Sequence, residues 1–500
     1  MIGAEAVQAT PPRVQADRLD LDRMPGRRPM PILREYGNLA LFFRDPMGYL
    51  DGLAREHGNV AMFSRGMRRG MIWPKEESPG AVFLFGPKLL REVLTTHATY
   101  PEAVVGRFPA EWGGAARLTG GLLWLVGDRH RQHRRVITPL YHQRRIEGYR
   151  DLMVQVIGTA LDGLRPGQRI GVMDEVGKIL ATFQSDMLLG VANMPGEKGR
   201  LIERLAEFWE RMKNPAAHVV PINLPFTPRG RLLECGNHLS KELDELIAIK
   251  RAAPEPGHDV LSMMAHSKYE DGTSMTDDEL VSETLHLFVG GWVSTRSSMA
   301  WTTMLLAQHP RIAAELYEEL DSVLHGDAPT VAQLKDLTLL DCVLKESLRL
   351  FPPIPFVSRV SNEAVELGGY KIPPRTELHL SMYHTHRDPE LYPDPYAFRP
   401  ERWRTLDPDT DTYLPFGIGR RVCPGKALAT LQMKIMLALL VQRYRLEPVK
   451  PANLRCGGVG IMAIQPDLNV IVRRQDKRFR ESWAKVTGNV TSMVDLPQVV

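Results

Sequence analysis

Hydrophobic residues recur with the 3.6-residue period of a helix over two long stretches of the chain, residues 143–350 and 427–443. Short strand-like runs lie nearer the ends, at residues 59–63, 81–85, 376–380 and 468–472. Because these runs are far apart along the chain, they can share a sheet only if the chain folds back on itself. The pattern therefore predicts a mainly α protein with small β-sheets, of the α+β class.

The same pattern divides the chain only near its ends. Residues 24–475 contain neither an internal repeat nor a low-complexity linker, so we expect a single domain there. Residues 1–23 are a polar leader, and residues 476–500 are a tail of uncertain order. The leader lacks the apolar core of a signal peptide, and no apolar run is long enough to span a membrane. We expect a cytoplasmic protein without a transmembrane anchor.

One long helix can be delimited from local signals. Thr276 and Glu279 have the spacing of a capping box, which satisfies free N–H groups at a helix start. The helical pattern continues to Gln308, before Pro310, which predicts a helix roughly 45–50 Å long at 1.5 Å per residue. Gly290 and Gly291 lie near its middle. A glycine pair there indicates either close helix packing or a groove beside a ligand.

Composition narrows the class of protein. Hydrophobic residues make up 43% and charged residues 24% of the 500, as in ordinary globular proteins. The net charge of +4 gives no reason to expect nucleic-acid binding. Four scattered cysteines, Cys235, Cys342, Cys423 and Cys456, are too few for a disulfide framework or a zinc site.

Cys423 differs from the other cysteines in its surroundings. It follows a turn that contains Gly417 and Gly419, and it directly precedes Pro424 and an apolar helical run. We expect Cys423 near the N-cap, where free N–H groups and the helix dipole lower the pKa of a thiol. These features alone fit either a redox nucleophile or an axial metal ligand.

Spacing favours the metal ligand. Phe416, Gly419, Arg421, Cys423 and Gly425 match F-x-x-G-x-R-x-C-x-G, so the chain resembles the cytochrome P-450 family of haem-thiolate monooxygenases, in particular its soluble bacterial members. Two further motifs match in order: E-x-x-R at Glu346 and Arg349, and P-E-R at residues 400–402. The resemblance implies heme b (iron protoporphyrin IX), bound between the long helix and the helix that follows Cys423.

The resemblance also assigns roles to individual residues. It implies that Cys423 is the iron ligand, that Phe416 and Gly425 shape the haem loop, and that Glu346, Arg349 and Arg402 form a buried structural triad. The haem propionates are expected to bind His130, Arg134, Arg359 and Arg421. The substrate pocket is expected to include Phe288, Gly290, Gly291, Trp292, Phe356, Val357, Ile461 and Met462. Because most of these are apolar, we expect a mostly apolar organic substrate, with bulky Trp292 restricting the space over the haem.

The resemblance further implies a partner for electron supply. The haem domain uses nearly the whole chain, so electrons must come from a separate protein, expected to be a ferredoxin with its reductase. A local basic patch would receive it: Arg129, Arg131, Arg135, Arg144, Arg145, Arg420 and Lys426. A second surface feature is the unusually long segment 64–79, whose Met67, Met71, Ile72 and Trp73 would contact a membrane surface or an apolar partner, or form an exposed loop tip. Arg107 and Arg117 are candidates to anchor a substrate carboxylate.

One position departs from the family pattern. Many members carry an acid and a threonine at mid-helix, where Val293 and Ser294 stand in this chain. Ser294 can still orient a water molecule as the catalytic hydroxyl, whereas Val293 cannot transfer a proton. The leading hypothesis is an O2-dependent monooxygenase that hydroxylates or epoxidises a secondary-metabolite or lipid-like substrate. The alternatives are a peroxide-driven or rearranging haem-thiolate enzyme and a non-catalytic helper subunit.

Overall fold

The computed structural model describes residues 19–67, 70–71, 78–96, 108–191, 200–219, 222–457 and 460–497. It divides into two compact units, each built from separate stretches of the chain. Unit 1 comprises residues 1–85, 96–101 and 358–380, and unit 2 comprises the remainder. The expectation of a single domain over residues 24–475 stays a prediction.

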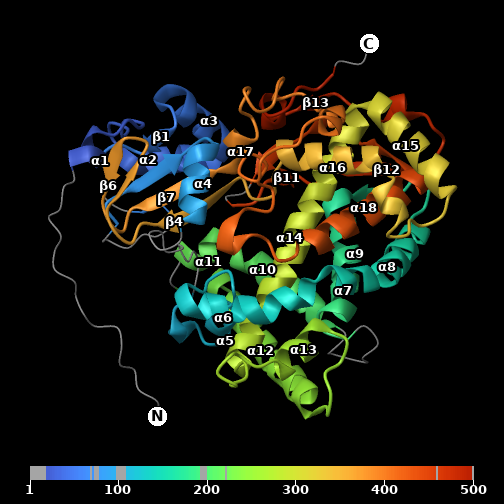
Figure 1. Cartoon of the computed structure of the whole chain (residues 1–500), viewed down its shortest axis with the longest axis horizontal. Helices are drawn as coiled ribbons and strands as arrows, with labels where there is room; N and C mark the ends of the chain where they lie inside the picture. The colour runs from blue at the N-terminus through green and yellow to red at the C-terminus, as the bar shows by residue number, and fades with distance from the viewer. Residues whose placement is uncertain are drawn as a thin grey trace. The chain divides into compact units, whose positions relative to one another are not determined.

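Unit 1 contains a small sheet, formed as the strand-like runs predicted. Its strands are β1 (Val60–Met62), β2 (Ala81–Leu84), β7 (Glu377–Ser381) and β4 (Phe356–Val360), in the order β1-β2-β7-β4 (Figure 1). β1 and β2 are antiparallel, whereas β2 and β7 are parallel and lie almost 300 residues apart in the sequence. The other elements are α1 (Leu19–Arg23), α2 (Arg34–Arg44), α3 (Pro46–His57) and the hairpin of β5 (Val365–Leu367) and β6 (Tyr370–Ile372).

Aromatic side chains hold the sheet of unit 1 to its helices. Phe42 on α2 lies edge-to-face with Tyr49 on α3 and with Phe63, at ring-centroid distances of 5.8 and 5.6 Å. Phe83 on β2 stacks on His379 on β7 at 4.7 Å. Edge-to-face and stacked aromatic pairs of this kind are the favourable geometries.

Unit 2 is mainly helical, which confirms the predicted class. Its helices are α4 (Pro87–Thr95), α5 (Gly114–Leu118), α6 (Gly127–Ile137), α7 (Gln143–Gly148), α8 (Arg150–Asp162), α9 (Val172–Met187), α10 (Leu201–Met212), α11 (Pro215–Val219), α12 (Pro228–Ala252), α13 (Val260–His266), α14 (Asp277–Gln308), α15 (Pro310–Leu324), α16 (Thr338–Leu350), α17 (Met382–Thr385) and α18 (Lys426–Arg443). Short 3-10 turns include η5 (Pro400–Arg404) and η6 (Gly419–Arg421). No helix among the described residues has the length and apolarity needed to cross a membrane.

The strands of unit 2 form three small sheets. One sheet has the order β3 (Arg169–Gly171), β12 (Asn469–Arg474), β8 (Tyr444–Pro448), and it contains the predicted run 468–472. β10 (Arg455–Gly457) pairs with β11 (Ala463–Gln465). β9 (Ala452–Asn453) pairs with β13 (Val486–Thr487), so the region after residue 475 contributes a strand, as well as the 3-10 turns Phe479–Ser482 and Asn489–Ser492.

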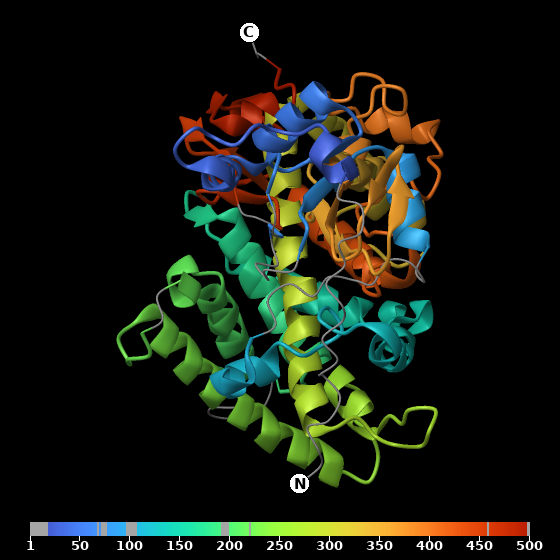
Figure 2. The same ribbon diagram turned by 90° about the vertical axis from the view of Figure 1, so that its left-hand side faces the viewer.

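The long helix α14 is the centre of unit 2 and begins where the sequence predicts. The Thr276 hydroxyl accepts from the Glu279 N–H, and the Glu279 carboxylate accepts from the Thr276 N–H, so both halves of the capping box form. The helix packs against α9, α12, α16 and α18, and Figure 2 shows it as one continuous yellow ribbon. Most of its residues are buried on all sides, which explains its weak amphipathic pattern.

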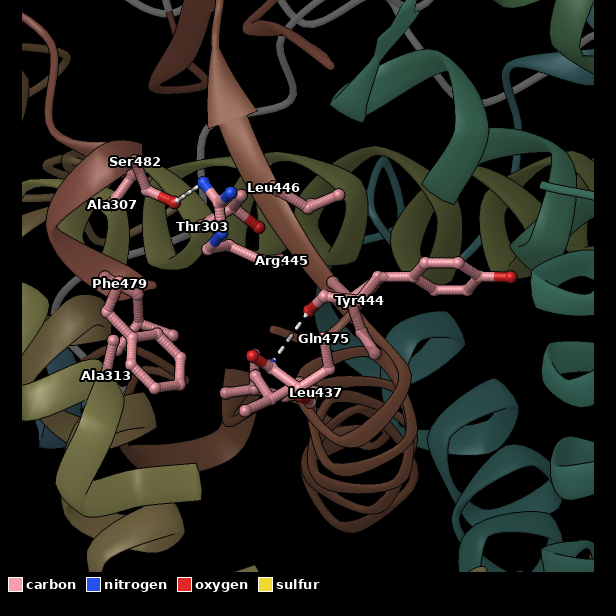
Figure 3. Close-up of a pocket in the computed structure, with 13 residues that line it drawn as sticks. Thr303, Ala307, Ala313, Leu437, Tyr444, Arg445, Leu446, Gln475, Phe479 and Ser482 are labelled. Atoms are coloured by element: carbon pink, nitrogen blue, oxygen red, sulfur yellow. Dashed lines mark hydrogen bonds between the residues drawn. The ribbon is translucent and has the colours of Figure 1, made fainter. Parts of the chain in front are cut away.

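A small internal cavity lies beside the C-terminal part of α14. Its volume is about 50 Å³, and Thr303, Ala307, Leu437, Tyr444 and Arg445 are among the residues that line it (Figure 3). A pocket of this volume suits water molecules rather than an organic substrate.

Candidate functional site

The loop before α18 holds Cys423 in a fixed position. The Cys423 N–H donates to the Phe416 carbonyl at 2.8 Å, and the Val422 N–H donates to the Gly419 carbonyl at 3.1 Å. Gly417 and Gly419 have φ of 68° and 72°, a left-handed conformation that side chains other than glycine rarely adopt. The helix itself begins at Lys426 with Gly425 as N-cap, so Cys423, expected near the N-cap, lies two residues before it.

Burial dominates the electrostatics of the Cys423 thiol. The low-dielectric surroundings raise its pKa, and the Gly425 N–H and the charges of Arg134 and Lys426 oppose this effect without overcoming it. The expectation that the helix start alone lowers the pKa is therefore wrong for the protein without a metal. A half-buried thiol that receives an N–H and faces two cations is suited to bind a metal as thiolate, because the metal supplies the missing positive charge.

Two arginines tie this loop to the neighbouring segments. Arg134 on α6 donates through Nη2 to the Val422 carbonyl at 2.6 Å. Arg421 donates through Nη1 to the carbonyls of Leu122 and Leu123 at 3.0 and 3.2 Å. His130, one turn before Arg134, is buried with 4% of its surface exposed. The structure thus brings three of the four predicted propionate ligands, His130, Arg134 and Arg421, to elements that adjoin the Cys423 loop. The fourth, Arg359, is a buried residue of β4 in unit 1.

The two mid-helix glycines of α14 have different surroundings. A Cβ at Gly291 would lie 2.6 Å from Nε2 of Gln184, so α9 packs directly against this position. A Cβ at Gly290 would meet nothing within 4 Å, and Gly290 is exposed although most of α14 is buried. The sequence left close packing and a ligand groove as alternatives. Gly291 is explained by close packing, whereas Gly290 faces open space, which is compatible with a ligand there.

Ser294 lies on the same side of α14 as Gly290. Its hydroxyl donates to the Gly290 carbonyl at 2.6 Å, and the side chain is partly exposed. Val293 is buried at 5% exposure. Thr295 is also buried, and within the described part of the chain its hydroxyl finds no hydrogen-bond partner. Because α14 is an unbroken helix here, Thr295 does not reach the Gly290 side, and Ser294 is the hydroxyl that does.

Trp292 points away from that side, which corrects an expectation. Its indole N–H donates to the carbonyl of Gly177 on α9 at 2.8 Å, and its ring stacks on Phe288 at 5.4 Å. The guanidinium of Arg296 lies 3.6 Å from the Trp292 ring centroid and pairs with Glu210 on α10 at 2.8 Å. Trp292 and Phe288 are therefore packing residues between α14, α9 and α10, and Trp292 does not narrow the space beside Gly290.

The other predicted pocket residues lie in two segments. Met462 is buried, and its carbonyl accepts from the Trp301 indole of α14 at 2.8 Å, which fixes Ile461 and Met462 beside that helix. Phe356 and Val357 begin β4, with Phe356 buried and Val357 partly exposed. Arg117 is not free to bind a substrate carboxylate, because it pairs with Asp244 and Asp278 at 2.8 and 2.7 Å. Arg107, and residues 68–69 and 72–77 of the 64–79 segment, lie outside the described residues, whereas Met67 is buried.

Glu346, Arg349 and Arg402 form a buried network. Glu346 accepts from Arg349 through both oxygens at 2.9 Å, and from Arg402 Nε at 3.0 Å. The Trp403 indole adds a donor at 2.9 Å. Arg349 also donates to the carbonyl of His386 at 2.7 Å. Glu346 and Arg349 are fully buried, so the i,i+3 pair is not a solvated surface pair.

A second buried carboxylate cluster was not singled out from the sequence. His133 on α6 contacts Glu283 of α14 through Nδ1 at 2.7 Å and Glu279 through Nε2 at 3.1 Å. Three titratable residues of α14, at positions 279, 283 and 286, repeat at helical spacing, and this was the signal available in the sequence. Their partner on α6 is almost 150 residues away, and no local pattern connects the two helices.

Three arginines of the predicted basic patch are neutralised by ion pairs, and a second group of cations, which includes Lys426 of that patch, lines a surface pocket. Arg129, Arg131 and Arg135 pair with Glu279, Asp128 and Glu270. A surface pocket of about 1020 Å³ adjoins the Cys423 loop at Pro424. Exposed cations line this pocket: Lys335, Arg404 and Lys426.

The residues around Cys423 fit a haem. The site offers a soft sulfur ligand, which suits iron, and cationic side chains that suit carboxylates. On α14, Gly290 leaves open space for a flat group to approach the backbone, as an alanine there would not. These groups come from α6, the Cys423 loop and the middle of α14, all within unit 2.

Comparison with known proteins supports the same assignment. Residues 34–471 match the sequence model of the cytochrome P-450 family. The chain is 30% identical over 376 residues to cyclooctat-9-en-7-ol 5-monooxygenase from Streptomyces melanosporofaciens, which covers 74% of this chain and 80% of that protein. It is also 30% identical over 379 residues to cyclooctatin synthase from the same organism, covering 74% and 81%. Its fold is similar to that of retinoic acid-bound cyanobacterial CYP120A1, with a TM-score of 0.75 at 22% identity over 90% of this chain and 99% of the other.

Proposed function

The chain belongs to the cytochrome P-450 family, and we propose that it inserts oxygen from O2 into a mostly apolar organic substrate, using electrons from a separate ferredoxin-type protein. The family membership makes the chain a haem-dependent monooxygenase with heme b as cofactor. The finer proposal concerns the substrate, the partner and the roles of single residues.

The observation that carries the proposal is the Cys423 loop. Its sulfur is half-buried, it receives the Gly425 N–H, and Arg134 and Lys426 supply positive charge nearby. In our proposal Cys423 would bind the haem iron, Phe416 would shield the sulfur, and His130, Arg134 and Arg421 would bind the propionates. When bound, the haem iron supplies the activation of dioxygen, which a thiolate ligand favours.

The residues of α14 would then orient the reaction. Ser294 holds its hydroxyl against the Gly290 carbonyl, on the one side of the mid-helix that is not covered by α9. There it can position a water molecule as both donor and acceptor. Val293 is buried and has no proton to give, so protons must reach Ser294 from another group.

The chemistry of the lining residues and the relatives supports an apolar substrate. After Trp292 and Phe288 are assigned to packing, the predicted pocket residues other than the two glycines are all apolar: Phe356, Val357, Ile461 and Met462. Of two Streptomyces relatives, one is named as a 5-monooxygenase of cyclooctat-9-en-7-ol and the other as cyclooctatin synthase. We therefore propose a mostly apolar substrate of the secondary-metabolite or lipid-like class, oxidised by hydroxylation or epoxidation.

The surface pocket beside Pro424 supports the redox partner. Its exposed cations Lys335, Arg404 and Lys426 would attract an acidic ferredoxin next to the loop that holds Cys423. Charge reversal at Arg404 and Lys426 should slow reduction by ferredoxin and weaken its dependence on salt. Arg311→Glu on α15, 91% exposed at its side chain, is the matched control. Stopped-flow reduction that is independent of both salt and these charges would contradict the docking site.

The carbon monoxide difference spectrum of the reduced protein tests the proposed function. Thiolate ligation gives a strongly red-shifted Soret band, and Cys423→Ser should abolish that band and O2-driven turnover. Cys235→Ser replaces another partly exposed thiol and should leave both unchanged. A Cys423→Ser variant that retained the band would show that the ligand is a different residue.

A peroxide-driven enzyme is the second candidate, and Val293 is the observation that favours it. A haem enzyme that receives hydrogen peroxide needs fewer protons delivered by the protein than one that receives O2. Product formation with hydrogen peroxide alone, together with failure of O2 and a reduced ferredoxin, would select this candidate.

A further inference from the structure

A buried imidazole bridges two carboxylates between α6 and α14. His133 is fully buried, and its two ring nitrogens face different glutamates: Nε2 faces Glu279 at 3.1 Å and Nδ1 faces Glu283 at 2.7 Å. Glu279 lies at the start of α14 with its side chain 13% exposed, next to the exposed Arg129. Glu283 is fully buried one turn further along the helix. The imidazole therefore connects a carboxylate that solvent reaches to one that it does not.

The far oxygen of Glu283 is unused. Oε1 contacts His133, but Oε2 is buried and no described residue offers it a hydrogen bond. A buried carboxylate oxygen without a donor costs free energy unless the group is protonated or passes a proton on. The groups that act electrostatically with Glu283 include Tyr141, Tyr269 and His286.

His286 continues the series toward the reaction centre. Burial lowers its pKa, and the charges of Arg421 and Arg134 act in the same direction, against that of Glu283. The ring is therefore neutral near pH 7, with one nitrogen able to accept a proton and the other able to donate one.

The whole series lies on one face of α14. Positions 279, 283, 286, 290 and 294 are separated by four, three, four and four residues, which is the spacing of neighbours on one helix face. This face ends at Ser294, next to the position where Val293 replaces an acidic side chain. The chain thus lacks a proton donor beside Ser294 and has a row of titratable groups leading toward it.

We propose that Glu279, His133 and Glu283 form a proton relay from the protein surface toward His286 and Ser294. The relay rests on the proposed function, since it supplies the protons that reduction of O2 consumes. In one transfer, a proton that Glu279 Oε1 has taken from solvent moves to His133 Nε2 while His133 Nδ1 loses one to Glu283 Oε1, and Glu279 returns to the carboxylate that pairs with Arg129. The imidazole changes tautomer and stays neutral, and one proton has moved from Glu279 to Glu283. Glu283 would then give a proton to one ring nitrogen of His286 while the other ring nitrogen releases one, and a water molecule would carry that proton to the Ser294 hydroxyl.

Exchange of the His133 ring proton with D2O tests the relay without turnover. His379 in unit 1 is an internal control, because it is fully buried beside a buried glutamate, Glu377, at 3.1 Å. In holoenzyme labelled with nitrogen-15 at histidine, we expect the His133 ring signal to exchange much faster than that of His379. Glu279→Gln should slow exchange at His133 at least about ten-fold and leave His379 unchanged. Exchange at His133 as slow as at His379 would overturn the relay.

Product formation with two oxidants gives the second measurement. Glu283→Gln should lower O2-driven product formation about ten-fold or more, since positioned proton transfer commonly contributes 10² or more. Hydrogen peroxide brings its own protons, so peroxide-driven product formation should change less than about two-fold. Glu377→Gln, the control, should leave both unchanged. Equal losses with both oxidants would mean that Glu283 only maintains structure. If the wild-type protein uses neither oxidant, the proposed function fails, and the exchange measurement still decides the relay.

Discussion

Two glutamates of unit 2 are equally buried but use their oxygens differently. Both carboxylate oxygens of Glu346 are occupied, by Arg349, Arg402, the Trp403 indole and the Arg399 N–H. Glu283 has one oxygen on His133 and leaves the other without a donor among the described residues. A buried charge whose every lone pair is bonded is immobile and serves structure. A buried carboxylate with an unused oxygen keeps a place for a further hydrogen bond, and in our proposal this difference separates the structural cluster of Glu346 from the relay that contains Glu283.

The largest expected effect is in the Glu346 cluster. Glu346→Gln removes the negative charge that two buried guanidinium groups share, and breaking a buried ion pair in this way costs about 3–5 kcal/mol of unfolding free energy. Denaturant unfolding and haem content of the purified protein would measure it. Glu401→Gln is the control. Glu401 lies on η5, the 3-10 turn that also carries Arg402, and its side chain is 55% exposed. If Glu346→Gln lowered the unfolding free energy no more than the control does, Glu346 would not be the charge that balances Arg349 and Arg402.

An intermediate effect is expected at His386, whose carbonyl binds Arg349. Burial, together with the charges of Arg349 and Arg387, lowers the pKa of His386 to about 3, and its Nε2 accepts the Leu414 N–H at 2.7 Å. The unfolded chain therefore binds a proton between about pH 6.5 and pH 3 that the folded protein does not bind. Stability should fall as pH decreases through that range, by up to about 1.4 kcal/mol per pH unit.

Comparison of variants isolates this contribution from the other titrating groups. In His386→Gln the amide oxygen can still accept from Leu414, and the stability should depend less on pH below 6.5 than in the wild type. Exposed His258→Gln should keep the wild-type dependence. Unfolding free energies from urea titrations at several pH values give the slopes. Parallel slopes for all three proteins would show that His386 takes up its proton in the folded state.

The smallest effect on stability is expected at Glu283. In Glu283→Gln the amide oxygen can still accept from His133, and no cation loses its partner, so the unfolding free energy should change by about 1 kcal/mol or less. The same denaturant titration as for Glu346→Gln makes the two glutamates directly comparable. A loss as large as that of Glu346→Gln would remove the distinction between the clusters and assign Glu283 to structure.

The local parts of the fold were predictable from sequence because short-range rules govern them. The bounds of α14 follow from the Thr276 capping box and from Pro310, and both operate within a few residues of the chain. The predicted strands and helix periodicity were confirmed for the same reason. The Cys423 motif was also local, since its glycines are needed for left-handed turns within the loop itself.

Positions of helix starts and pKa values were less predictable. The N-cap lies at Gly425 because the residues after the turn complete the loop before the first helical hydrogen bond, from the Ala429 N–H to the Gly425 carbonyl, can form. The pKa of Cys423 depends mainly on burial by segments distant in sequence. The charges of residues near Cys423 in the sequence do not predict this effect.

By itself, the sequence determined the elements, the thiol loop and the family to which the chain belongs. Only the tertiary structure decided which way side chains of α14 face: Trp292 bonds to Gly177 of α9, whereas Gly290 and Ser294 lie on an open side. The hydrogen bond from Arg402 to Glu346 could not be derived from local sequence rules. The same holds for the contact between His133 and Glu283, which are 150 residues apart. The physical reason is the distance along the chain over which each kind of interaction acts. Turns, caps and periodicity are set by neighbours along the chain, whereas burial and hydrogen-bond partners are set by packing between helices that are distant in sequence.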